Sequence, residues 1–179
     1  MKVLAIIFLC LSLLPMTVTG GVKAGRLPEA INSTLNRKFP GWRFSEVSVE
    51  VRQFFGERFP DARPDLIEGD FDGNGRTDYA VLIEHTNFNK SGKTFTHVVE
   101  LLAFLKRGTK YKLYTLKESA PATPELYLTL AGKGSEGRSF HTQSRFRYPY
   151  DSITVSYFGK AGGTYIFRRG RFRYVYESD

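Results

Sequence analysis

One acidic loop that runs directly into a hydrophobic strand constrains this chain more than any other feature. The segment LIEGDFDGNGRTDYAVLIE, residues 66–84, places oxygen-bearing groups at alternate positions before it turns apolar. Calcium is a hard cation that takes about six to eight oxygen ligands, and a tightly curled loop with alternating acidic residues supplies them. The spacing therefore predicts a calcium loop over residues 70–78, with these ligands: Asp70, Asp72, Asn74, the backbone carbonyl of Arg76, and Asp78.

The details of this loop separate it from the helical calcium motif. Gly75 stands where the loop has to turn sharply, and glycine takes a positive φ at little cost. An EF-hand would need a bidentate Glu where this chain has Val81, and it would need helices on both sides. With a strand leaving directly from Asp78, residues 66–84 resemble the calcium loop of FG-GAP and VCBS repeats. The resemblance implies a calcium-binding turn between two strands, and because it occurs once it does not imply a propeller.

A metal-free acidic turn is the alternative interpretation of the same residues. Asp, Asn and Gly are common in ordinary β-turns, so their presence alone does not require a cation. Three carboxylates within one short loop, however, repel one another unless a cation lies between them. This repulsion favours the calcium interpretation.

Residues 1–20 predict a secretory signal peptide. A basic residue precedes an apolar run that is too short to span a bilayer, and small residues follow. Cleavage after Gly20 or Ala24 would remove it, and residues 25–179 would form one secreted or periplasmic domain without a transmembrane segment. The single cysteine, Cys10, lies in the removed segment, so that domain is expected to have no disulfide and no thiolate metal site.

The rest of the chain predicts an α+β fold. Residues 28–39 indicate a short helix, and residues 44–59 fit either a strand or a helix, of which we favour a helix over 48–58 capped by Ser48. Beyond residue 65, aromatic and β-branched residues separated by turns indicate antiparallel strands. We therefore expect short N-terminal helices packed on an antiparallel, meander-like β-sheet. The expected strands are 79–86, 95–105, 111–117, 126–130 and 153–158, with a hairpin loop at 87–94 and a mobile loop at 131–139.

The final hairpin, residues 164–177, is expected to turn at Arg169-Gly170. A two-residue turn would place four aromatic residues on one face of the hairpin: Tyr165, Phe167, Phe172 and Tyr174. The opposite face would then carry three basic residues: Arg168, Arg171 and Arg173. A bulged turn would shift this register, so the arrangement depends on the turn.

Charge favours an anionic partner. The formal net charge is +8, from 26 basic and 18 acidic residues. Candidate contacts for an anionic polymer are Arg168, Arg171, Arg173, Lys110 and Lys112. Hairpin tips also carry charge merely to stay soluble and to avoid edge-to-edge pairing. An envelope protein is the other expected partner, and no motif for specific nucleic-acid readout is present.

Two histidines offer a possible second metal site. His85 and His97 are nearly equidistant from the middle of the 87–94 loop, so they could lie side by side on adjacent strands. Glu84 alternates to the face opposite His85, which removes a natural third ligand. We therefore favour ordinary hydrogen-bonded or surface histidines.

The sequence gives little support to catalysis. It contains no nucleophile elbow, and calcium held in a loop lacks the open, polarising position of a catalytic zinc. We expect a non-catalytic binding module stabilised by calcium. An inhibitor of a secreted or envelope enzyme is the first alternative, and an enzyme of unrecognised type is the second.

Overall fold

The computed structural model describes residues 26–88, 95–121, 124–160 and 162–177. The predicted signal peptide and most of the predicted 87–94 loop lie outside these residues. The described part is mostly antiparallel β-sheet with two short helices, which confirms the broad α+β class. The helices are α1 (Glu29–Lys38) and α2 (Val49–Arg58).

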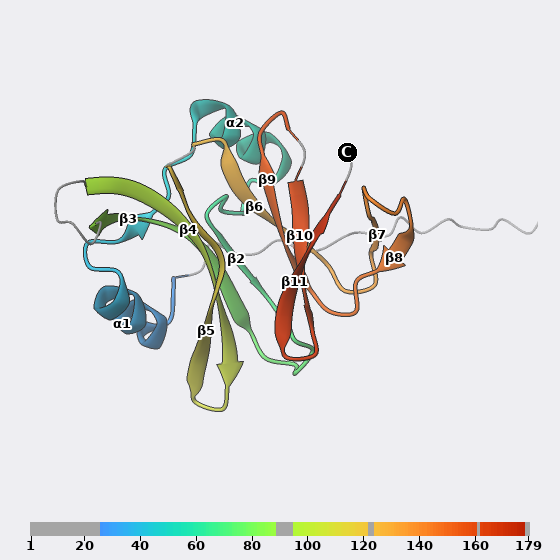
Figure 1. The fold of residues 1–179 in the computed structure, drawn as a ribbon, viewed down its shortest axis with the longest axis horizontal. Helices are drawn as coiled ribbons and strands as arrows, with labels where there is room; N and C mark the ends of the chain where they lie inside the picture. Colours follow the sequence, from blue (N-terminus) through green and yellow to red (C-terminus); the bar gives the residue numbers. More distant parts are fainter. Residues whose placement is uncertain (1–25, 89–94, 122–123, 161, 178–179) are drawn as a thin grey trace, which may run out of the picture.

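The strands divide into two main sheets (Figure 1). The first sheet has the order β1-β3-β4-β5, with β2 also paired to β3: β1 (Arg43–Phe44), β2 (Leu66–Gly69), β3 (Asp78–Phe88), β4 (Phe95–Arg107), β5 (Lys110–Pro121). The second has the order β11-β10-β9-β6: β6 (Leu126–Ala131), β9 (Ser152–Tyr157), β10 (Gly162–Arg168), β11 (Arg171–Tyr176). The single meander-like sheet expected from the sequence is therefore not confirmed.

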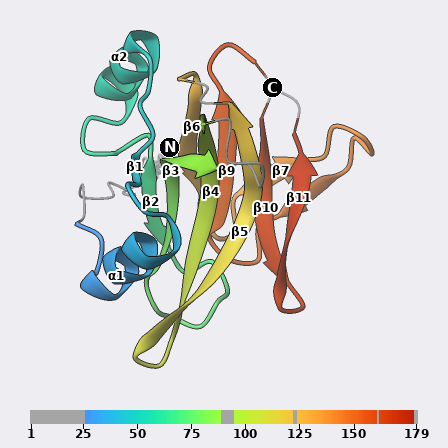
Figure 2. The same cartoon turned by 60° about the vertical axis from the view of Figure 1, so that its left-hand side comes forward.

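The stacking of α1, the first sheet and the second sheet follows from strands that are apolar on both faces. One face of β3 and β4, which includes Leu82 and Leu101, packs against Leu128 and Ile153 of the second sheet. The opposite face packs against the apolar side of α1, where Ile31 is fully buried. Figure 2 shows this order, with α1 on one side of the first sheet and the second sheet on the other. A strand buried on both faces needs cover on both.

The second helix resolves the ambiguity of residues 44–59. The Ser48 hydroxyl accepts a hydrogen bond from the Val51 backbone N–H at 3.3 Å, as an N-cap residue does. Val51 and Phe55 lie one helical turn apart and are both buried, and the Phe55 ring packs 5.6 Å from the Tyr127 ring of β6. Helical spacing thus explains the burial of this segment better than strand alternation.

Part of the stretch expected to be a mobile loop is a short ribbon. Residues 136–138 form β7 (Glu136–Arg138), which pairs with β8 (Arg145–Arg147). Gly137 is buried there, and an added Cβ would come within 2.6 Å of the Phe146 ring. The glycine that indicated a loop instead permits close packing of an aromatic ring.

Three chain reversals meet at one end of the molecule. They are the β2–β3 loop, the β4–β5 turn and the β10–β11 turn (Figure 1). A hydrogen bond of 3.1 Å from the Asn74 amide to the Lys106 carbonyl joins the first two. Among the described residues, neither helix is long and apolar enough to span a bilayer.

Candidate metal centre

Antiparallel pairing of β2 and β3 closes the acidic loop on itself. Gly69 and Asp78 are register partners, so the residues between them form a hairpin loop. Asp70, Asp72 and Asp78 each present a carboxylate oxygen, and these oxygens lie within 4.8 Å of one another. The three acids that the sequence selected therefore converge at one point.

Backbone donors hold the first acid in place. One oxygen of Asp70 accepts the Asn74 N–H at 2.9 Å and the other accepts the Gly75 N–H at 2.9 Å. These short-range bonds require a tight reversal, and Gly73 and Gly75 provide it with φ angles of +75° and +74°. The positive φ expected at Gly75 is present.

Asp78 is the most deeply buried member of the cluster. Its side chain is in the core at 0 % exposure, where one oxygen accepts the Phe71 N–H at 2.9 Å and the other the Lys106 N–H at 2.7 Å. Burial raises the pKa of this carboxyl to about 6, and the negative charges of Asp72 and Asp70 add to the effect, while the two N–H donors oppose it. A bound cation would act in the opposite direction and favour the ionised form.

Asp72 is the member of the cluster that pairs with a basic side chain. Its side chain is 2 % exposed, and the Arg107 guanidinium forms an ion pair with its Oδ2. Its Oδ1 accepts the Asn74 N–H at 3.2 Å. One guanidinium offsets the charge of one of the three clustered carboxylates, and a metal ion is a group that would offset the others.

The remaining two predicted ligands lie on the exposed limb of the loop. The Asn74 side-chain oxygen accepts the Arg76 N–H at 2.9 Å, which turns the limb back on itself. The Arg76 guanidinium donates to the Gly108 carbonyl at 3.4 Å. The ligand roles of the Asn74 oxygen and the Arg76 carbonyl stay predictions.

Two residues far away in the sequence also shape the loop. Asp151, which precedes β9, accepts the Asp70 N–H at 3.0 Å and the Lys133 N–H at 2.9 Å. The neighbouring Tyr150 ring lies so close to Gly73 that a Cβ there would overlap it. No local pattern in residues 66–84 indicates either partner, because both arrive through the packing of the second sheet.

His85 and His97 do not form a paired metal site, in agreement with the interpretation favoured from the sequence. His85 lies opposite Val98 and His97 lies opposite Thr86, so the two rings occupy opposite faces of the β3–β4 pair. The His85 Nε2 atom lies 2.9 Å from a Glu100 carboxylate oxygen, which makes it a hydrogen-bonded histidine.

The basic residues fall into two groups. Register pairs Phe167 with Phe172 and Arg168 with Arg171, as a two-residue turn requires, so Arg168, Arg171 and Arg173 share one face. Lys110 and Lys112 lie on β5 in the other sheet, and the Lys112 ammonium sits 4.9 Å from the Tyr114 ring. Strand alternation turns Lys112 to the same side as Tyr114, whose ring contacts Phe167 and Phe172 of the last hairpin. Binding of an anionic polymer by these five residues stays a prediction.

The chemistry of the loop has to be argued from its own residues. The chain matches no protein-family model, no curated protein and no solved structure. The clustered ligand atoms are carboxylate oxygens, which suit a hard cation such as calcium rather than a transition metal that prefers imidazole or thiolate. The donor set therefore suits a hard cation, and calcium stays the prediction of the loop spacing.

Proposed function

We propose that this chain is a non-catalytic, secreted or periplasmic binding module that calcium stabilises. The observation that carries the proposal is the convergence of three carboxylates, Asp70, Asp72 and Asp78, whose oxygens lie within 4.8 Å of one another. A divalent cation at this point would replace the repulsion among the three carboxylates by attraction. The proposed ligands are Asp70, Asp72, Asn74, the Arg76 carbonyl and Asp78.

A structural role for the cation is favoured over a catalytic one. The loop offers about five protein oxygens, so a calcium ion with six to eight ligands would have few positions left for a substrate. The same loop contacts β4 through Lys106 and the second sheet through Asp151. A cation there would hold the acidic loop, the β4–β5 turn and the segment before β9 in a fixed arrangement.

The direct test is calorimetric titration of metal-free protein with calcium. We expect a saturable binding heat with a dissociation constant on the order of 10⁻⁴–10⁻³ M or tighter. Asp70→Ala should abolish most of it, while Asn74→Ala should weaken it less because a neutral ligand is lost. Asp61→Ala removes an exposed acid outside the loop and is the matched control.

The proposal fails if the native protein gives no binding heat with calcium. It also fails if Asp70→Ala and Asp61→Ala respond to calcium alike, since the heat would then come from non-specific charge screening. Magnesium should bind poorly, because it demands a tighter octahedral shell.

A further inference from the structure

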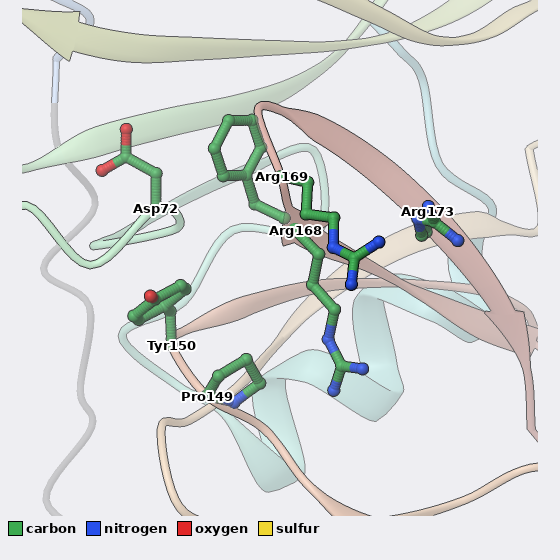
Figure 3. A pocket seen from close by; sticks show the side chains of 7 residues that line it. Asp72, Pro149, Tyr150, Arg168, Arg169 and Arg173 are labelled. Atoms are coloured by element: carbon green, nitrogen blue, oxygen red, sulfur yellow. The ribbon is translucent and has the colours of Figure 1, made fainter.

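A cavity of about 580 Å³ lies beside the acidic loop (Figure 3). Three separate parts of the chain meet around it: the loop itself, the segment before β9, and the β10–β11 hairpin. Its lining residues are Asp72, Pro149, Tyr150, Phe167, Arg168, Arg169 and Arg173. This volume is typical of pockets for small molecules, which measure roughly 300–1,000 Å³.

The cavity has an excess of positive charge. Arg168, Arg169 and Arg173 form no ion pair among the described residues. Asp72 is the one acid in the lining, and its side chain is buried and paired with Arg107. Figure 3 shows its carboxylate turned away from the side where the Arg168 and Arg169 guanidinium groups lie. An anion entering from that side would therefore meet guanidinium groups rather than a carboxylate.

The position of Arg169 adds an independent observation. Arg169 and Gly170 have φ angles of +51° and +80°, and they join the paired residues Arg168 and Arg171. Two positive φ angles define a type I′ turn, which favours Asn-Gly because those residues adopt the left-handed region most easily. Arginine there costs backbone free energy, and strained residues of this kind cluster at binding sites.

We propose that this cavity binds the phosphate or sulfate monoester group of a small organic anion. Guanidinium groups present planar, forked donors that match the oxygens of such an ester. Tyr150 and Pro149 provide an apolar flank for the organic part of the ligand. The inference rests on the proposed role as a binding module, but the arginine geometry that carries it does not depend on calcium.

The test uses sugar esters that differ only in the charged group. Glucose 6-phosphate, glucose 6-sulfate and neutral glucose are titrated into the full-length mature protein by calorimetry, in chelator and in millimolar calcium. Either ester should bind at least tenfold more tightly than glucose. The two ester arms decide whether phosphate or sulfate is preferred.

Two triple variants with the same net charge distinguish ester binding in this cavity from non-specific attraction of the ester to a basic protein. Replacing Arg168, Arg169 and Arg173 with Gln should weaken ester binding at least tenfold, because charge-assisted hydrogen bonds are lost. The control variant replaces three exposed arginines elsewhere with Gln, namely Arg52, Arg138 and Arg145. It changes the net charge equally and should leave ester affinity within twofold. Equal losses in the two variants would overturn the proposal, as would esters that bind no better than glucose.

Arg169→Asn guards against misfolding as an explanation. Asparagine suits the type I′ turn, so the melting temperature should stay the same or rise while ester affinity falls severalfold. Unchanged ester affinity in this variant would remove Arg169 from the site. Ester binding without any calcium response would refute the calcium proposal and leave the ester site intact. Calcium binding without ester binding would refute the ester site and leave the calcium proposal intact.

Discussion

Strand β3 carries two buried acidic groups that are treated in opposite ways by their surroundings. Near its middle, Glu84 is 4 % exposed, and its two oxygens accept hydrogen bonds from Arg43, Ser45 and the Glu46 N–H at 2.8–3.1 Å. At its start, Asp78 lies in a cluster with two further carboxylates, Asp70 and Asp72. Burial of an acid and hydrogen bonds to both of its oxygens are common to Glu84 and Asp78. The charge of the neighbours distinguishes them, because Glu84 faces the Arg43 guanidinium whereas Asp78 shares its site with two other acids.

The largest expected effect is that of calcium on thermal stability. At a free calcium concentration of about one hundred times the dissociation constant, linkage adds roughly 2.7 kcal/mol, which for a domain of this size raises the melting temperature by about 5–10 °C. Asp72→Asn should abolish this shift, since it removes a charged ligand from the cluster. Thermal unfolding in chelator and in millimolar calcium measures it. If the unfolding midpoint of the native protein does not change with calcium, the Asp72 cluster is a purely structural group of carboxylates, as Glu84 is.

The stabilisation supplied by Glu84 should not depend on calcium. Glu84→Gln removes the charged acceptor shared by three donors and should cost about 2 kcal/mol of unfolding free energy, equally in calcium and in chelator. Denaturant unfolding measures the loss. Glu136→Gln is the control, because its ion pair with Arg147 is exposed and should contribute little. A Glu84→Gln loss that calcium reverses would contradict the distinction between the two sites.

The smallest expected effect concerns pH in the metal-free protein. The folded-state pKa of Asp78, about 6, lies above the ordinary value near 3.8, so the folded protein holds this proton more tightly than the unfolded chain does. The stability that protonated Asp78 contributes to the folded protein is complete below about pH 4, and it disappears as the pH rises through about 6. Melting temperatures of metal-free protein and of Asp78→Asn should therefore diverge across this window. Parallel curves for the two proteins would show that Asp78 does not titrate there.

Much of this fold could be predicted because its signals are local. Ser48 caps the second helix, and the Arg169-Gly170 dipeptide fixes the register of the last hairpin. The three carboxylates of the loop converge for the same reason, since a short hairpin loop cannot separate them. Signals confined to one turn survive in the folded protein because few other contacts compete with them.

The rest depends on packing between distant segments. Apolar residues on both faces of β3 indicate that the strand is covered twice, but they do not specify that the second cover is another sheet. Arg107 and Asp151 contact the loop only after β4 and the segment before β9 are in place. The spacing of residues 66–84 contains no trace of either partner.

The bond between Asp151 and the Asp70 N–H also bears on folding kinetics. It spans 81 residues and joins the acidic loop to the second layer of the molecule, so it forms only when both layers have docked. Closing a segment of this length costs chain entropy before the contact contributes stability, so we expect this bond to form late in folding. A ligand that strengthens late contacts slows unfolding and leaves the folding rate nearly unchanged. A cation in this loop would accordingly prolong the lifetime of the native state more than it would hasten its formation.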